Sequence, residues 1–126
     1  MSEPVFKHVI CPVVVVKVME GQIKGDTLAD DLRAEFLALA TQTEAVHFVL
    51  DFQSVTYVAS AGIRPLLALN RYLKDKGRRM ILCNLHRDVR EVLEVTRLLS
   101  SSGTTPVTFE AQPDVLTAIS VLYKGA

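Results

Sequence analysis

Short apolar runs alternate with longer amphipathic segments along this chain, and this order limits the possible folds more than any other feature. The runs at residues 45–51, 80–83 and 107–109 have the length and apolar character of strands. Between them, apolar residues recur at spacings of three and four, which predicts amphipathic helices. Because each strand is followed by a helix and then by another strand, the sequence predicts a mostly parallel sheet.

The first 23 residues predict two further strands. β-Branched side chains dominate residues 5–10 and 13–16. Cys11 and Pro12 separate these two runs, and proline cannot donate a hydrogen bond to a strand ladder. We therefore predict a turn at Cys11 and Pro12 and an N-terminal hairpin near the edge of the sheet.

Four helices complete the predicted order ββαβαβαβα. The first begins at Asp26 or Thr27, either of which can cap it, and ends at about residues 41–43. The second covers about residues 61–76 and stops near Gly77. The third carries an apolar stripe, and the fourth opens at Gln112 and Pro113, with proline at its first position. The stripe of the third helix consists of Val89, Val92, Leu93 and Thr96.

No linker or repeat divides the chain, so we expect one α/β domain over residues 1–126 with a mixed, mostly parallel sheet. Its 14 basic and 14 acidic side chains argue against direct nucleic-acid binding. The longest apolar run, residues 9–16, is far shorter than the roughly 20 residues of a membrane-spanning helix. The N-terminus lacks the pattern of a secretory signal. We expect a cytoplasmic protein without membrane insertion.

The sequence lacks the motifs of common enzyme classes. It contains no phosphate-binding glycine loop, no dinucleotide-binding glycine motif and no nucleophile elbow. His8, His47 and His86 do not share metal-ligand spacing with each other or with cysteine. We therefore expect no enzymatic activity, no cofactor and no metal site, and we interpret Cys11 and Cys83 as buried thiols.

A phospho-aspartate receiver is one alternative for an α/β domain of this size, with Asp51 at a strand end as the acceptor. That chemistry needs Mg²⁺ and several oxygen ligands. Only Glu20 stands where further carboxylates should cluster, and no lysine follows the last strand. The sequence therefore argues against a receiver.

Residues 51–63 carry the most functional information. They predict a strand, a loop and the beginning of the second helix, with the small residues Ala59, Ser60 and Ala61 at the helix start. The Ser60 hydroxyl has two compatible interpretations. It can cap the helix, or it can accept a phosphate that the backbone N–H groups and the positive helix end would stabilise.

Pro65 bears on where this helix begins. If Ser60 were the cap, Pro65 would be the fifth helical residue, where its ring meets the carbonyl of Ala61. The helix is therefore also compatible with a start near Gly62 or Ile63, which would leave Ser60 in an exposed loop.

The second helix has two faces. Leu66, Leu69 and Leu73 are spaced to pack on the sheet, and a mostly basic ridge follows another side. This ridge is either a solvated face or a docking face for an acidic partner. The predicted partner-binding residues are Ala59, Ser60, Ala61, Gly62, Arg64, Leu67, Ala68 and Arg71.

Residues 51–63 closely resemble the core motif of the STAS domain family, the anti-sigma factor antagonists. In that family an Asp-Leu pair leads through a short loop to Asp-Ser-Ser/Thr-Gly-Leu. The resemblance extends over most of the chain, to residues 21–23 and 84–98, and includes the order of strands and helices. Ala59 and Ala61 depart from the family's aspartate and second hydroxyl residue, and Lys24 stands where an aspartate is common.

The resemblance implies that Ser60 is the residue that a serine protein kinase phosphorylates and a phosphoserine phosphatase restores. On this hypothesis the chain is a partner-switching regulator: unphosphorylated, it binds an anti-sigma factor or the serine kinase, and phosphorylation releases it. The alternative is a constitutive STAS interaction subunit of a transport or signalling complex, in which Ser60 is only a helix cap. Ala59 and Ala61 favour this alternative slightly, because the acidic determinant of the usual kinase is missing.

Overall fold

The computed structural model describes residues 5–10, 13–42, 47–95 and 109–124 of the chain. They form a mixed five-stranded sheet, a separate pair of short strands and four helices. In chain order the elements are β1 (Val5–Ile10), β2 (Val13–Val18), β3 (Gln22–Ile23), α1 (Asp26–Gln42), β4 (His47–Asp51), β5 (Tyr57–Val58), α2 (Ser60–Asp75), β6 (Met80–Cys83), α3 (Arg87–Val95), β7 (Glu110–Gln112) and α4 (Val115–Lys124).

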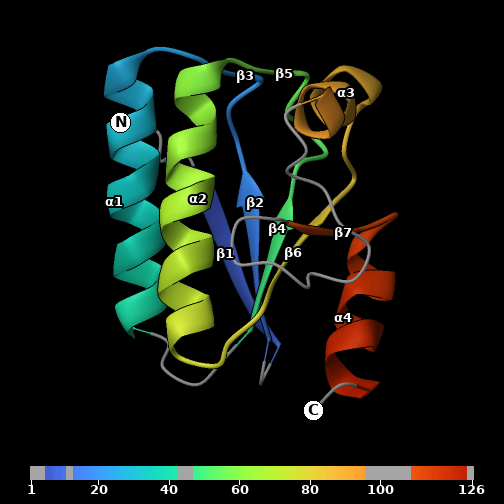
Figure 1. The fold of residues 1–126 in the computed structure, drawn as a ribbon. Coiled ribbons are helices and arrows are strands. Elements are labelled where there is room, and N and C mark those ends of the chain that lie inside the picture. The colour runs from blue at the N-terminus through green and yellow to red at the C-terminus, as the bar shows by residue number, and fades with distance from the viewer. Residues whose placement is uncertain (1–4, 11–12, 43–46, 96–108, 125–126) are drawn as a thin grey trace.

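The strands of the large sheet follow the order β1-β2-β4-β6-β7 (Figure 1). β1 pairs antiparallel with β2, and every other neighbouring pair is parallel. The predicted hairpin and mostly parallel sheet are therefore confirmed. Cys11 and Pro12, where we expected the turn, lie outside the described residues.

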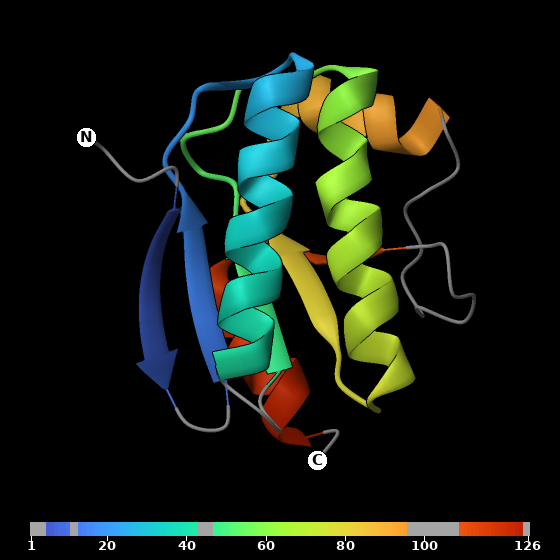
Figure 2. The same cartoon turned by 90° about the vertical axis from the view of Figure 1, so that its left-hand side faces the viewer.

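Both faces of the sheet are covered, because alternate side chains of each strand point to opposite faces. α1 and α2 lie side by side on one face, and α4 covers the other (Figures 1 and 2). On β2, Val14 and Val16 belong to the core under α1 and α2, whereas Val13 and Val15 belong to the core beside α4. This arrangement explains why the central strands are apolar along their whole length.

The first two helices agree with the sequence prediction. α1 begins at Asp26 and buries Leu32, Phe36 and Leu39, whose spacings of four and three are those of an amphipathic helix. α2 ends at Asp75, and Gly77 follows it with a φ of +70°, a conformation that favours glycine.

The C-terminal prediction was shifted along the chain. The last strand lies at Glu110–Gln112, and residues 107–108 of the predicted strand, like Thr96 of the third helix, are outside the described part. α4 begins at Val115 instead of at Pro113. Asp114 explains this start, since its Oδ1 accepts a hydrogen bond of 2.8 Å from the Thr117 N–H and so caps the helix.

The pair formed by β3 and β5 was not predicted. Gln22 lies opposite Tyr57, and Ile23 lies opposite Val58, in a parallel register. The Ala59 N–H donates a hydrogen bond of 2.9 Å to the Ile23 carbonyl oxygen. The backbone of residues 57–59, directly before α2, is thus hydrogen-bonded to the distant segment at residues 22–23.

Candidate functional site

The strand β4, which leads toward α2, ends at Asp51, whose side chain is hydrogen-bonded to two loops. One carboxylate oxygen of Asp51 accepts hydrogen bonds from the Gln53 N–H at 2.9 Å and from the Asn84 side-chain amide at 3.0 Å. Asp51 is buried, with 7% of its surface exposed. Its carboxylate therefore holds two loops together, and this placement gives no support to Asp51 as the phosphate acceptor of a receiver.

Ser60 is the first residue of α2, and it is exposed. Ala59 is the N-cap residue, with an extended backbone (φ −83°, ψ 168°) and without a side-chain hydrogen bond to the helix. The helix begins within one residue of the predicted start at about residue 61. The two geometries considered for Ser60 are both wrong, since it is neither the N-cap residue nor part of a loop ahead of a helix that begins near Gly62 or Ile63. The bond from Ala59 to Ile23 holds Ala59 extended and so places the boundary directly after it.

Pro65 does not interrupt α2. It lies inside the helix and is buried. The first turn is already closed before this residue, because the Gly62 N–H donates a hydrogen bond of 2.9 Å to the Ala59 carbonyl. Ser60 is therefore exposed on a helix terminus, not in a loop ahead of the helix.

Gly62 is a packing residue. A Cβ atom at this position would lie 2.6 Å from the Ile23 Cγ2 atom, 2.8 Å from the Ile23 carbonyl oxygen and 3.0 Å from the Val58 Cγ1 atom. Gly62 was predicted to belong to the partner-binding surface. This prediction is wrong, because Gly62 is buried against the β3–β5 pair.

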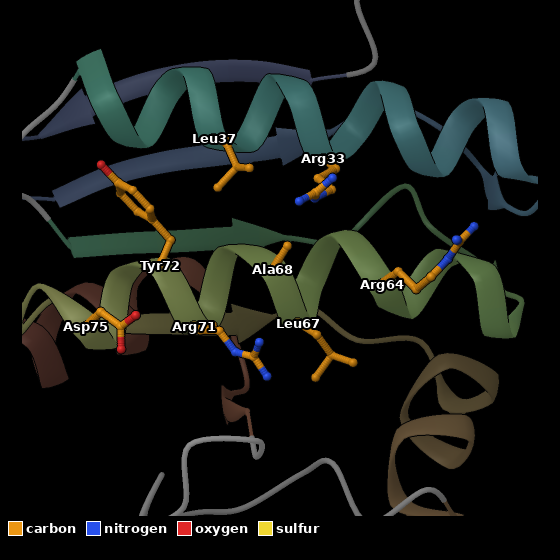
Figure 3. A pocket seen from close by; sticks show the side chains of 8 residues that line it. All are labelled: Arg33, Leu37, Arg64, Leu67, Ala68, Arg71, Tyr72 and Asp75. Atoms are coloured by element: carbon orange, nitrogen blue, oxygen red, sulfur yellow. The ribbon is translucent and has the colours of Figure 1, made fainter.

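The predicted ridge of α2 lines one side of a groove between α1 and α2 (Figure 3). The groove has a volume of about 460 Å³. Leu66, Leu69 and Leu73 are buried in the core with residues of the sheet, as predicted. We call this surface the α1–α2 groove; its lining residues are Arg33, Leu37, Arg64, Leu67, Ala68, Arg71, Tyr72 and Asp75.

Sequence analysis identified the α2 side of the groove and missed Arg33 and Leu37 on α1. These two residues are spaced by four, so they share one face of that helix. The spacing alone does not show that this face of α1 lies next to α2. An ion pair of 2.6 Å joins Asp26, the first residue of α1, to Arg64 in the second turn of α2.

The other residues considered as candidates have structural surroundings. His47 accepts a hydrogen bond of 3.0 Å from the Arg79 N–H through Nδ1, and burial together with the charges of Arg79 and Arg78 lowers its pKa. Cys83 is fully buried, and burial raises the pKa of its thiol to about 12. Neither residue lines the α1–α2 groove.

Within the described residues, no group of three or more histidine, cysteine, aspartate or glutamate side chains is placed to hold a metal ion. None of the helices in that part of the chain is long and apolar enough to span a bilayer.

Comparison with known proteins gives a match to the STAS domain model over residues 20–111. The chain is also 36% identical over 72 residues to BtrV of Bordetella bronchiseptica, which is provisionally described as an anti-sigma factor antagonist. That alignment covers 57% of this chain and 61% of BtrV, so the match spans less than two thirds of the relative.

Solved structures share the fold over almost the whole chain. An anti-sigma factor antagonist from Mycobacterium paratuberculosis superposes with a TM-score of 0.76 and 19% identity, covering 94% of this chain and 92% of the other. The Bacillus cell fate determinant SpoIIAA in its phosphorylated form gives a TM-score of 0.62 at 22% identity, with coverages of 94% and 98%. At such identities the similarity concerns the fold.

Proposed function

This chain belongs to the STAS domain family, and we propose that it is an anti-sigma factor antagonist that changes partners through phosphorylation of Ser60. With a free Ser60 hydroxyl it binds an anti-sigma factor or a serine kinase in the cytoplasm. A phosphate on Ser60 releases that partner, and a phosphatase restores binding. The chain itself contributes a surface and an acceptor hydroxyl, and carries out no reaction.

The exposed position of Ser60 at the start of α2 is the observation that carries this proposal. The helix has 16 residues, and no side chain caps its N-terminus. A phosphate with a charge of about −1.5 to −2 would meet uncapped backbone N–H groups and the positive end of the helix dipole. Arg64, one turn further along, is exposed as well.

The same phosphate would oppose a docked partner. Ser60 begins the helix whose ridge lines the α1–α2 groove, so a partner on that ridge would come close to the new charge. Like charges or a stranded charge in an interface cost several kcal/mol, and each 1.4 kcal/mol changes affinity about tenfold. We therefore expect roughly a hundredfold loss of affinity on phosphorylation.

The relatives support this proposal by analogy. SpoIIAA, which shares the fold, has been solved in a phosphorylated and in an unphosphorylated form. This chain carries alanine at positions 59 and 61, where the family has an aspartate and a second hydroxyl residue. We therefore propose that its kinase recognises Ser60 without an acidic residue directly before it.

The constitutive-subunit alternative assigned Ser60 the role of helix cap. In the structure Ser60 is not the N-cap residue, so it does not have that role. The alanines at positions 59 and 61, which favoured the alternative slightly, are unaffected by this finding.

Binding of the anti-sigma factor from the same cell tests the switch. Titration calorimetry should give the same dissociation constant for Ser60→Ala as for the unmodified protein, and a roughly hundredfold weaker one for Ser60→Asp. Ser120→Asp is the matched control, because Ser120 is exposed on α4, on the opposite side of the sheet. Equal affinities of Ser60→Ala and Ser60→Asp would refute the switch.

Mass mapping of the protein isolated from its own cell tests the modification separately. We expect a phosphate on Ser60 in part of the molecules. A population without any phosphate at Ser60, under all growth conditions in which the anti-sigma factor changes activity, would contradict the proposal.

A further inference from the structure

We propose that the α1–α2 groove is the docking site for an amphipathic helix of the regulatory partner that carries acidic side chains beside its apolar stripe. This inference rests on the proposed function for the identity of the partner as a regulatory protein. It adds to that function the kind of segment that binds and the part of the surface that receives it.

The shape and the floor of the groove fit a helix. α1 and α2 lie side by side (Figure 2), and the lining residues of the groove extend along α2 from Arg64 to Asp75, so the groove follows the helix direction. The floor is apolar, formed by partly buried side chains from both helices: Leu37 from α1, and Leu67, Ala68 and Tyr72 from α2. An amphipathic helix laid into a groove with its apolar stripe inward is a common mode of recognition.

The exposed charges along the groove favour a negatively charged partner. Arg33 on α1 and Arg71 on α2 are both exposed, and neither guanidinium group forms a hydrogen bond or ion pair with any other residue that the structure describes. Figure 3 shows Arg33 between the two helices and Arg71 on the side of α2 away from α1, so the two cations lie on either side of Ala68. Two guanidinium groups at the sides of an apolar strip match carboxylates at the sides of an apolar helix face.

Acidic residues of the chain itself limit where those carboxylates can sit. Asp75 lines the groove near the end of α2, and Asp26 lies at the beginning of α1. Asp30 is exposed one turn before Arg33 on the same helix. Along the helix direction, Arg33 and Arg71 therefore lie between these acidic groups, and we expect the acidic residues of the partner helix to lie at the same height.

Arg64 can add a third contact. Its ion pair with Asp26 is exposed to solvent, with 57% and 84% of the two side chains accessible. Pairs of this kind contribute little to stability, so a carboxylate of the partner can replace Asp26 at little cost.

A pair of designed peptides tests the inference directly. Each has about 14 residues, roughly four helical turns, with leucines at spacings of three and four. One carries glutamates beside the leucines and the other carries lysines at the same positions. In titrations followed by backbone amide NMR, we expect the glutamate peptide to shift the signals of residues 33, 37, 67 and 68, and to bind at least tenfold more tightly than the lysine peptide.

Charge reversal on the protein provides the matched comparison. Arg33→Glu and Arg71→Glu should each weaken the glutamate peptide about tenfold. Arg90→Glu, on α3 outside the groove, should leave its affinity unchanged. The double variant with glutamate at positions 33 and 71 should prefer the lysine peptide, a result that loss of fold cannot produce.

Three outcomes would overturn the inference: no binding of the glutamate peptide at about 1 mM, equal binding of the two peptides, or the same signal shifts with inorganic phosphate alone. The peptide titration does not use the Ser60 variants. If the peptides bind as expected while Ser60→Ala and Ser60→Asp bind the anti-sigma factor equally, the switch fails and the groove assignment stands. If instead the two Ser60 variants differ as expected and the peptides do not bind, the phosphorylation switch stands and the groove assignment fails.

Discussion

At the scale of single residues, the first turn of α2 contains one position that is exposed and one that is tightly packed. The proposed phosphorylation requires an accessible Ser60, and the structure exposes this residue. Gly62 must be small, because Ile23 and Val58 fill the space where a side chain would be. The hydroxyl can therefore be replaced without disturbing the core, whereas the glycine cannot.

Gly62→Ala should destabilise the protein. The extra methyl group would meet a backbone oxygen at 2.8 Å, and overpacking of this kind typically costs about 1–3 kcal/mol. Over most of this range the cost exceeds the gain of about 1 kcal/mol in helix propensity from glycine to alanine. Urea unfolding monitored by circular dichroism measures the difference in the free energy of unfolding.

Gly21→Ala is the control for this substitution, because a Cβ atom at Gly21 would meet its nearest neighbour, the Ser54 carbonyl oxygen, at an ordinary 3.8 Å. It should change stability by far less. A Gly62→Ala protein as stable as the parent would show that the β3–β5 pair yields to the added methyl group.

At the scale of elements, the ends of the helices are held by residues from other parts of the chain. The last turn of α1 contains no basic residue. Arg78, which follows α2, is buried and donates a hydrogen bond of 2.9 Å from Nη1 to the carbonyl oxygen of Ala40 in that turn. Its guanidinium also lies over the Phe48 ring, 5.6 Å from the ring centroid. One cation thus joins the end of α1 to the beginning of β4 and β6.

Arg78→Met should lower the free energy of unfolding by about 1–3 kcal/mol. Methionine keeps an apolar stem in the buried position but removes the hydrogen bond to Ala40 and leaves that carbonyl without this donor. Chemical denaturation measures the loss, and faster amide exchange should localise it to the end of α1. Arg90→Met, at an exposed arginine of α3, should stay within about 0.5 kcal/mol of the parent.

At the scale of the whole molecule, the central strands are protected by helices on both faces. β6 lies between β4 and β7, and all four of its residues are buried. Cys83 at the end of this strand packs in the core beside α4, and its thiol contacts the Leu50 carbonyl oxygen at 3.6 Å. Its reactivity therefore reports how often the molecule opens.

Cys83 should react with a disulfide reagent only when the protein unfolds. The reactive species is the thiolate, and burial raises the pKa of this thiol to about 12, so almost none is ionised at pH 8. In a Cys11→Ser background, we expect labelling in native buffer to be many times slower than in urea. Its rate should increase with urea in parallel with global unfolding.

The same Cys11→Ser protein, fully unfolded in urea, provides the control rate of an accessible thiol. Rapid labelling of Cys83 in native buffer would contradict the buried position and indicate that α4 opens locally.

Much of this architecture could be predicted from the sequence, because its signals are local. The bounds of α1 and α2 follow from apolar residues repeating over many turns, together with Asp26 at one start and Gly77 after the other end. The C-terminal region shows the limit of such signals. Pro113 and Asp114 are both suited to a helix start, and the hydrogen bond of Asp114 decided between them.

The sequence by itself determined the alternation of strands and helices, the mostly parallel sheet and the family, since periodicity and the motif around Ser60 are properties of neighbouring residues. Only the tertiary structure decided which residue caps α2, why residue 62 must be glycine and which side chains of α1 face α2. All three depend on contacts between distant segments, Ile23 with Ala59 and Gly62, and α1 with α2. The pattern along one helix shows which face is apolar, but the neighbour that this face meets is chosen by packing.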